Sequence, residues 1–249
     1  MKTLILTPEM RIGGTCRDAV EWANRLADCG DEVVVVAQSA TGEGGARLSP
    51  AVKLEGLGGG RAILSASRLL RLLRKHPDAT ILANAGTLAG LAIVFRSLGL
   101  IGHRVVFVDP FNPADTFRRG WKTAAIYRCL LWRADAFVHL SDYAERFHRR
   151  IGLCAENSFC VPNISSRSDE ITAVSQPARA LRCVAVGRLD KIKGFDRLIG
   201  AFGQVATRWP GATLRIVGEG YDRSRLEDAI RQAGLVDRVT LVGHADAVR

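Results

Sequence analysis

The sequence VGRLDKIKGF, residues 186–195, connects a short apolar run to a stretch with helical periodicity. The apolar run Cys183–Val186 has the length of a buried strand, and Phe195–Arg208 has the spacing of a helix. Open α/β sheets bind their ligands in the loops at the carboxyl ends of such strands. Within this loop Arg188 offers a planar fork and Lys193 a point charge, so both can contact one pair of phosphates. The stretch therefore predicts a parallel α/β domain with a phosphate-binding loop, although a merely solvated basic loop is an open alternative.

The same alternation continues downstream of this loop. Thr213–Val217 is a second apolar strand, and it leads into Gly218-Glu219-Gly220. Glycines on both sides of a carboxylate allow a tight turn, which can direct Glu219 into the same crevice as the basic pair. A plain strand-to-helix turn explains the motif nearly as well. A helix over Ser224–Ala233 and a strand over Val239–Val242 follow.

Upstream, short apolar runs again alternate with helical stretches, as in a parallel sheet covered on both faces. The predicted strands are Thr3–Thr7, Glu32–Ala37, Thr80–Ala83, Arg104–Val108, Ala136–Leu140 and Ser158–Val161. The predicted helices are Thr15–Cys29, Ala62–Lys75, Thr87–Leu98, Arg119–Arg133 and Asp142–Ile151. Before the first helix, Gly13 and Gly14 let a ligand approach the backbone, and Thr15 can cap the helix through its hydroxyl. A helix start favours an anion, although a structural turn explains the two glycines equally well.

Two domains follow from this arrangement. The first covers residues 1–164, and the polar, aperiodic segment 165–180 is interpreted as a linker. The second covers residues 181–249 and contains three predicted strands and two predicted helices. A domain usually has on the order of 100–150 residues, so we expect this second α/β domain to be incomplete.

Positive charge is concentrated in one part of the chain. The net charge is +10, and residues 61–133 contain twelve Lys/Arg against three acids. This excess indicates an anionic partner: lipid headgroups, a phosphorylated substrate or nucleic acid. In the helix Ala62–Lys75 arginines lie beside a leucine stripe, and more basic residues surround Trp121 and Trp132. Such helices suit an anionic membrane surface, or else pack on a core with a solvated basic face. The basic residues are confined to helices and are not interleaved with aromatic residues on which bases could stack. This pattern argues against nucleic-acid binding.

The six cysteines are scattered, without a C-x-x-C pair or histidines at metal-binding spacing. They are interpreted as reduced thiols, which predicts a cytoplasmic protein without a metal site. The first apolar segment is too short for a signal peptide. The stretch Leu88–Ile101 is shorter than the roughly 20 residues that span a bilayer. In the membrane interpretation, the protein is peripheral at the inner face of the membrane.

Taken together, several motifs resemble the family-4 glycosyltransferases, which have the GT-B fold of two Rossmann-like parallel-sheet domains. The resemblance is carried by Gly13-Gly14, Val161-Pro162-Asn163, Gly187-Arg188-Leu189, Lys193-Gly194-Phe195, Trp209-Pro210-Gly211-Ala212, Leu214 to Gly220 and Asp237 to Gly243. It is dense from Val186 to Gly243 and diffuse before that stretch. The resemblance implies a GT-B fold in which the C-terminal domain is incomplete.

The resemblance also implies a reaction. A UDP- or GDP-sugar donor binds the second domain, a saccharide or lipid-linked acceptor binds the first, and a hexose is transferred with retention, in polysaccharide or glycolipid biosynthesis. Arg188 and Lys193 hold the donor diphosphate and stabilise the leaving group, so that no metal or cofactor is required. Gly13 and Gly14 contact the donor phosphates from the first domain, and Glu219 belongs to the same donor site.

Two departures from the family pattern bear on activity. The E-x7-E segment, whose carboxylates contact the donor sugar and ribose, is expected after Gly243 and is absent from this sequence. A non-catalytic remnant or partner subunit is therefore the alternative function. Many members also carry a histidine where Asp109 stands. Asp109 is the candidate catalytic residue, binding a sugar hydroxyl or the acceptor, and a turn-initiating Asp-Pro is an equally open interpretation. His139 and Asp142 face the same crevice and are interpreted as core or cap residues.

Overall fold

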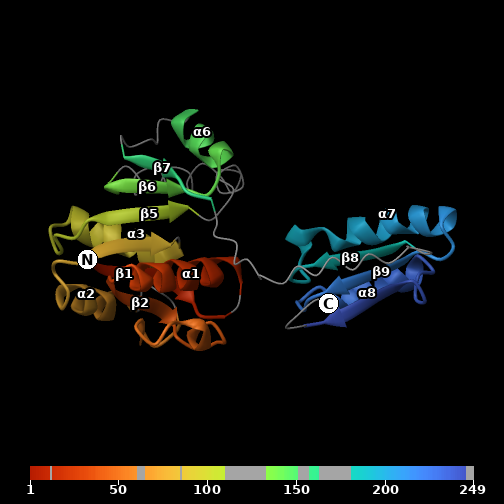
Figure 1. The fold of residues 1–249 in the computed structure, drawn as a ribbon, viewed down its shortest axis with the longest axis horizontal. Helices are drawn as coiled ribbons and strands as arrows, with labels where there is room; N and C mark the ends of the chain where they lie inside the picture. The colour runs from red at the N-terminus through yellow and green to blue at the C-terminus, as the bar shows by residue number, and fades with distance from the viewer. Residues whose placement is uncertain are drawn as a thin grey trace. The chain divides into compact units, whose positions relative to one another are not determined.

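The chain forms two compact units, Met1–Arg167 and Ser168–Arg249, in a computed structural model (Figure 1). The structure describes residues 1–11, 13–60, 65–84, 86–109, 133–150, 157–162 and 181–244. The predicted linker 165–180 lies outside these residues. Each unit has its own parallel sheet and its own hydrophobic core.

The first unit contains a seven-stranded sheet in the order β3-β2-β1-β4-β5-β6-β7. Its strands are β1 Lys2–Glu9, β2 Glu32–Ser39, β3 Lys53–Gly56, β4 Thr80–Asn84, β5 Val105–Asp109, β6 Ala136–His139 and β7 Ser158–Cys160. Its described helices are α1 Gly14–Asp28, the 3-10 turn η1 Gly45–Arg47, α2 Ala66–Arg74, α3 Gly86–Ser97 and α6 Asp142–Arg150. Because β1 pairs in parallel with both β2 and β4, the strand order reverses at β1. Open α/β sheets bind ligands at the carboxyl ends of the strands at such a reversal.

The central strand β1 explains why helices cover both faces of this sheet. Leu4 and Leu6 pack in one cluster with α2 and α3, whereas Ile5 packs in a second cluster with α1. All three side chains are fully buried. Burial of each contributes ~1.5–3 kcal/mol, so a continuous apolar run with no solvent-facing residue is stable only inside the sheet.

The structure differs from the sequence predictions at two places in the described part of the first unit. The pattern does not predict β3, because Lys53–Gly56 is not an apolar run; it is an edge strand paired with β2. Helix α1 begins at Gly14 with Gly13 as its N-cap and without a side-chain cap, so the predicted cap by Thr15 is wrong. The predicted helix Arg119–Arg133 falls, apart from its last residue, outside the described part of the chain.

The second unit contains a three-stranded parallel sheet in the order β10-β9-β8. Its elements are β8 Arg182–Val186, the 3-10 turn η3 Lys191–Lys193, α7 Phe195–Arg208, β9 Thr213–Val217, α8 Arg223–Gln232 and β10 Val239–Gly243. Side chains of α7 and α8 pack with those of β9 in one core. On β8, Cys183 and Ala185 pack against this core, whereas the alternate residues Val184 and Val186 are 54% and 66% exposed. One face of this sheet is therefore open at β8.

Candidate functional site

Two loops at the carboxyl edge of the second sheet lie backbone against backbone. The amide N–H of Leu189 donates to the carbonyl of Glu219 at 2.9 Å, and that of Asp222 donates to the carbonyl of Leu189 at 3.1 Å. Gly218 has a φ of 141°, and a Cβ there would lie 2.0 Å from the carbonyl oxygen of Gly187. The contact therefore requires glycine at position 218, and it fixes the basic loop against the Gly218-Glu219-Gly220 turn.

Arg188 and Lys193 stand at opposite ends of the basic loop, and Asp190 contacts both. The Nε of Arg188 donates to Asp190 Oδ2 at 2.6 Å, and the backbone N–H of Lys193 donates to Asp190 Oδ1 at 3.3 Å. Partial burial raises the pKa of Asp190, but the hydrogen bonds and charges of Arg188 and Lys193 together outweigh this effect and lower that pKa below its ordinary value. Asp190 is therefore an ionised group that orients Arg188.

The side chain of Lys193 lies beside Gly187, because its Cδ and Cε are 3.8 Å from the position of a Cβ on that glycine. Gly194 follows with a φ of 66°, and α7 begins at Phe195. The start of a helix carries partial positive charge, which adds to that of the two basic side chains. Arg188, Lys193 and the α7 start thus bring positive charge to this end of the second unit, where the carboxylates of Asp190 and Asp196 also lie.

Glu219 lies on the second of these loops, but its carboxylate has a partner within the unit. Its Oε1 accepts a hydrogen bond from Arg223 Nη1 at 2.6 Å and is 3.2 Å from the Cβ position of Gly243. Arg223 also donates from Nε to Glu227 at 3.0 Å. Glu219 is therefore near the predicted donor site and is tied to the start of α8 and the end of β10.

In the first unit, Gly13 and Gly14 form the start of α1. Gly13 is extended, with a φ of −173°, and among the described residues no atom lies within 4 Å of a Cβ built on Gly14. The first turn of α1 contains no acidic residue. Gly13 and Gly14 are exposed, and the free N–H groups at an exposed helix start can bind an anion.

Asp109 and His139 end neighbouring strands. They are partners in the register of β5 with β6, so their backbones meet at the carboxyl edge of the first sheet. His139 is fully buried and stacks on Phe137 and on His148, with ring centroids 6.0 and 5.0 Å apart. Neither of its ring nitrogens has a hydrogen-bond partner within the part of the chain that the structure describes. Burial lowers the pKa of His139, so it is a neutral core residue here.

Near the edge strand β7, Asp142, Glu145 and Cys160 place one potential metal-ligand atom each within 4.8 Å of the others. Internal contacts engage all three. Cys160 Sγ donates to Asp142 Oδ1 at 3.2 Å, and Glu145 pairs with Arg149 at 2.7 Å. Asp142 is also the first residue of α6, so the structure gives it both a helix-start position and a thiol partner.

The pH dependence of stability of the first unit should reveal the buried His148. Burial and the neighbouring His139 lower the pKa of His148 to about 4, despite its hydrogen bond to the carbonyl of Ala144. Between pH ~6.5 and ~4 the unfolded chain binds the proton and the folded chain does not, so stability falls as the pH falls. We expect the free energy of unfolding in urea to drop by ~2 kcal/mol over this window through this group.

His148→Gln should flatten that dependence, whereas His244→Gln, at an exposed position, should leave it unchanged. An identical pH slope in His148→Gln and the parent chain would contradict the assignment.

Three polar residues that the sequence pattern does not single out lie at the same edge of the first sheet. The oxygens Thr7 Oγ1, Gln38 Oε1 and Asn84 Oδ1 are buried and have no hydrogen-bond partner among the described residues. Asn84 Nδ2 donates to the carbonyl of Thr15 at 3.0 Å, which joins the end of β4 to the start of α1. Each of the three follows an apolar run, and a polar residue that closes a buried strand is the signal that could have identified them.

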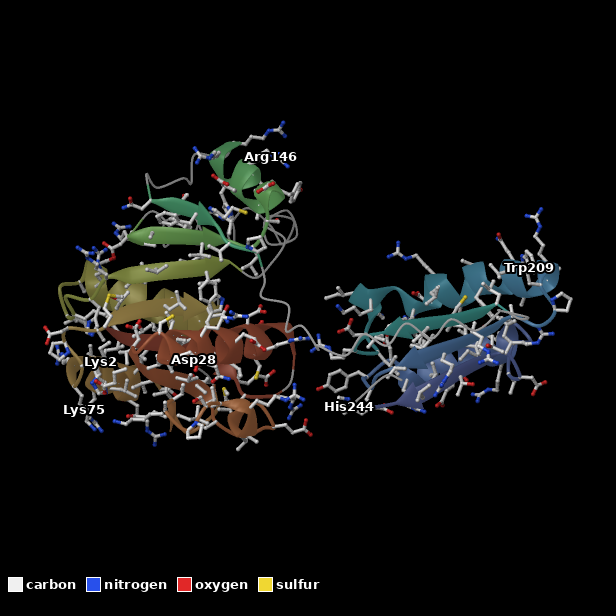
Figure 2. The ribbon with its side chains drawn as sticks, in the orientation of Figure 1. Lys2, Asp28, Lys75, Arg146, Trp209 and His244 are labelled. Atoms are coloured by element: carbon white, nitrogen blue, oxygen red, sulfur yellow. The ribbon has the colours of Figure 1, made fainter. Side chains whose placement is uncertain are left out.

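Helix α2 packs its leucine side on the core of the first unit. Its leucines Leu69, Leu72 and Leu73 are buried in the core. Its exposed basic residues are Arg68, Arg71 and Arg74, and Lys75 follows the helix and points outward (Figure 2). The helix thus packs on the core with a solvated basic face, and a membrane can attract it only through charge. None of the described helices combines the length and the apolar character that crossing a bilayer requires.

Two family models match the chain. The model of the glycosyl transferase 4-like domain matches residues 13–164, and that of glycosyl transferases group 1 matches residues 169–249. A curated relative from Streptococcus gordonii, the UDP-N-acetylglucosamine–peptide N-acetylglucosaminyltransferase GtfA subunit, is 33% identical over 78 residues. That alignment covers 31% of this chain and 15% of the relative, so the chain spans a small part of that protein's length.

Solved structures share the fold. HepE from Anabaena, in complex with UDP-glucose, superposes with a TM-score of 0.76 at 19% identity, over 98% of this chain and 69% of that one. WaaG, a glycosyltransferase involved in lipopolysaccharide biosynthesis, superposes with a TM-score of 0.73 at 18% identity, over 98% of this chain and 70% of that one. At these identities the likeness concerns the architecture.

Proposed function

This chain belongs to the family-4 glycosyltransferases with the GT-B fold, and from that premise we propose that it transfers a sugar from a nucleotide-sugar donor to a saccharide or lipid-linked acceptor. The observation that carries this proposal is the backbone pairing of the two glycine-containing loops of the second unit. It holds Arg188 and Lys193 at the carboxyl edge of the sheet, where an anionic ligand is expected. The pathway is the biosynthesis of a polysaccharide or a glycolipid.

Charge neutralisation by two cations is the proposed basis of catalysis. When the bond between the sugar and the diphosphate breaks, its electron pair goes to the leaving phosphate oxygen. Arg188 and Lys193 stabilise the negative charge that grows there, so the step needs no metal. The reaction is a hexosyl transfer with retention of configuration, and Asp109 accepts a hydrogen bond from a sugar hydroxyl or from the acceptor.

The donor nucleotide is proposed to be UDP in preference to GDP. HepE binds UDP-glucose in its solved complex, and the name of the Streptococcus gordonii relative specifies UDP-N-acetylglucosamine. Isothermal titration with UDP-glucose and with GDP-mannose tests this choice directly. We expect saturable binding of UDP-glucose that persists in EDTA; abolition of binding by EDTA would contradict the metal-free mechanism.

The alternative function is that of a partner subunit without turnover of its own. It is supported by the Streptococcus gordonii relative, which is itself named a subunit. Release of UDP from UDP-glucose, measured with and without candidate acceptors, separates the two functions. Donor binding without release of UDP under any condition would favour the subunit.

Contact with an anionic membrane surface is proposed to run through the basic face of α2. Each basic residue near such a surface contributes ~1 kcal/mol, so Arg71→Glu with Arg74→Glu should weaken binding to vesicles of phosphatidylcholine and phosphatidylserine by more than ~10-fold. Sedimentation with the vesicles measures the bound fraction. The matched control, Arg208→Glu with Arg231→Glu, makes the same charge change on the second unit. Equal binding of both double variants would count against α2 as the contact.

A further inference from the structure

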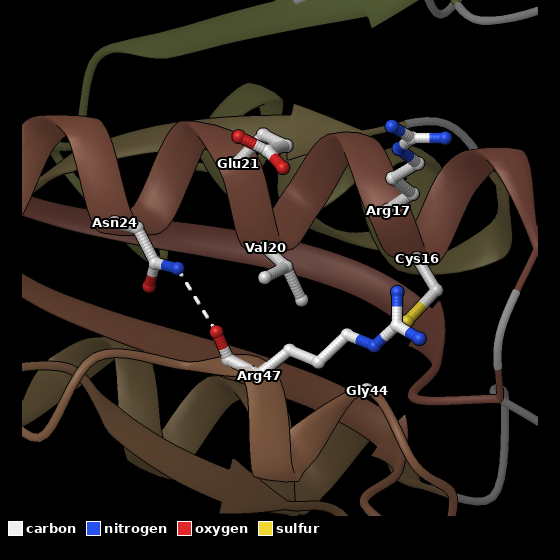
Figure 3. A pocket seen from close by; sticks show the side chains of 7 residues that line it. All are labelled: Cys16, Arg17, Val20, Glu21, Asn24, Gly44 and Arg47. Carbon is white, nitrogen blue, oxygen red and sulfur yellow. Dashed lines mark hydrogen bonds between the residues drawn. The ribbon is translucent and has the colours of Figure 1, made fainter. Parts of the chain in front are cut away.

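A cavity of about 110 Å³ lies between α1 and the segment Gly44–Arg47 that follows β2 (Figure 3). Cys16 and Val20 line it from α1, together with Glu21 and Asn24, and Arg47 lines it from η1. Because Cys16 is the third residue of α1, the cavity begins close to the open helix start at Gly14. It is therefore near the carboxyl edge of the sheet, where the first unit would meet a substrate.

The walls of this cavity are fixed by specific contacts. Asn24 Nδ2 donates to the carbonyl of Arg47 at 2.9 Å, and the N–H of Ser49 donates to Asn24 Oδ1 at 2.8 Å. At the other end, a Cβ on Gly44 would lie 2.4 Å from Cys16 Sγ, so the loop approaches the helix as closely as glycine allows. Asn24 thus uses both of its amide groups to hold the wall, which leaves the charged side chains for a ligand.

The side chains that line the cavity include both positively and negatively charged groups. Arg47 extends along the cavity toward Cys16 (Figure 3), and neither its guanidinium nor the carboxylate of Glu21 has a hydrogen bond or ion pair with another described residue. Arg17 also lines the cavity. A guanidinium only donates hydrogen bonds and a carboxylate only accepts them. A ligand with several hydroxyl groups, which do both, fits this set better than a simple anion or cation.

We propose that this cavity binds one ring of a saccharide acceptor, with Arg47 donating to its hydroxyl oxygens, Glu21 accepting from its hydroxyl hydrogens and Val20 contacting its C–H face. This assignment rests on the proposed glycosyl transfer and specifies the acceptor class as a saccharide. It places the recognition of the acceptor along the side of α1, separately from the donor loops of the second unit.

Cys16 provides a reporter for occupancy of the cavity, because its thiol is part of the wall. The chain is treated with methyl methanethiosulfonate at pH 8.5, which offsets the rise in the Cys16 pKa that burial causes, and modification is followed peptide by peptide in a mass spectrometer. The probes are methyl α-D-glucopyranoside, N-acetylglucosamine, methyl β-D-glucuronide and inorganic phosphate. At a saccharide concentration three times its Kd, modification of Cys16 should slow about fourfold. The exposed Cys29, just past the other end of α1, should react at the same rate throughout.

Arg47→Ala and Glu21→Gln should each remove this protection, and Arg25→Ala, an exposed change on the same helix, should retain it. A titration of backbone amide resonances with the same four probes gives a second measurement that does not depend on thiol reactivity. Shifts should concentrate at Cys16, Val20 and Asn24. Absence of both protection and localised shifts with every saccharide overturns the proposal, as does an effect of phosphate alone.

Binding of UDP-glucose by the same variants distinguishes this inference from the proposed function. Arg47→Ala should leave the affinity for UDP-glucose unchanged, because Arg47 is not among the residues predicted to contact the donor. Failure of the parent chain to bind UDP-glucose would count against glycosyl transfer, whereas normal UDP-glucose binding without saccharide protection of Cys16 would count only against this cavity.

Discussion

Replacing Arg188 or Lys193 by alanine should weaken the binding of UDP-glucose by ~10- to 100-fold, because in the proposed donor site each cation supplies a charge-assisted hydrogen bond to the diphosphate worth ~1.5–3 kcal/mol. Loss of both cations together should bring binding below detection in isothermal titration. The effect should be larger on the rate of UDP release than on affinity, since charge on the leaving phosphate is greatest in the transition state.

The geometry of Asp190 sharpens this expectation. Its carboxylate accepts from the Nε of Arg188 at 2.6 Å, which leaves the two Nη groups of the guanidinium for a phosphate. Arg188→Lys keeps the charge but loses the planar fork, so it should restore little of the affinity. Asp190→Ala releases Arg188 and removes the side-chain acceptor of the Lys193 N–H, which keeps its bond to the backbone carbonyl of residue 190; it should have an intermediate effect.

Arg208→Ala is the matched control for these variants. Arg208 is the last residue of α7, which puts it roughly 20 Å along the helix from Phe195 at 1.5 Å per residue. Its removal changes the net charge of the unit equally and should leave UDP-glucose binding unaltered. If Arg188→Ala and Arg208→Ala bind UDP-glucose equally well, the phosphate assignment is wrong.

Gly218→Ala should destabilise the second unit by at least ~3 kcal/mol, which is the largest effect on stability that we expect from a single added methyl group. A Cβ at this position would lie 2.0 Å from the carbonyl oxygen of Gly187, and the φ of 141° is itself strained for any residue other than glycine. The backbone carbonyl cannot move away without breaking the pairing of the two loops. Hydrogen exchange should therefore become faster in β8 and β9, and stay unchanged in β1 and β2.

Gly200→Ala provides the opposite result as a control. Gly200 lies within α7, and no described atom is within 4 Å of its Cβ position. Alanine there should stabilise the helix by ~0.5–1 kcal/mol. If Gly218→Ala and Gly200→Ala have similar free energies of unfolding, the close contact between the two loops does not exist in solution.

Prediction from the sequence succeeded for strands whose two faces are both covered by the protein, and for helices and strands that end at a glycine. Phe195–Arg208 and Thr213–Val217 have the same bounds in the prediction and in the structure, because each is an apolar pattern with glycine or proline near its limits. The strand β3 escaped prediction because its residues Lys53–Gly56 have no buried face of their own. Its place in the sheet comes from pairing with β2, which is a tertiary effect.

The candidate site was predictable in its residue types but not in its internal contacts. The strand–loop–helix order placed Arg188 and Lys193 at a sheet edge, and the structure agrees with that location. The partners within the unit, Asp190 for Arg188 and Arg223 for Glu219, depend on rotamers and loop geometry that a sequence pattern does not encode. The same applies to Asn84, whose contact with the start of α1 joins residues 69 positions apart.

The strand order of the first unit has a consequence for its synthesis on the ribosome. β1 pairs with β2 on one side and with β4 on the other, and β4 begins at residue 80, 71 residues after the end of β1 at residue 9. At ~5–20 residues per second, translation of β4 begins roughly 4–14 s after β1 is complete and roughly 2–8 s after β2 is complete at residue 39. During that interval one edge of the apolar strand Lys2–Glu9 has no partner. An unpaired strand edge can pair with a strand of another nascent chain, which leads to aggregation. In the described part of the second unit, by contrast, each strand pairs with the next one made, so these pairings require no distant segment.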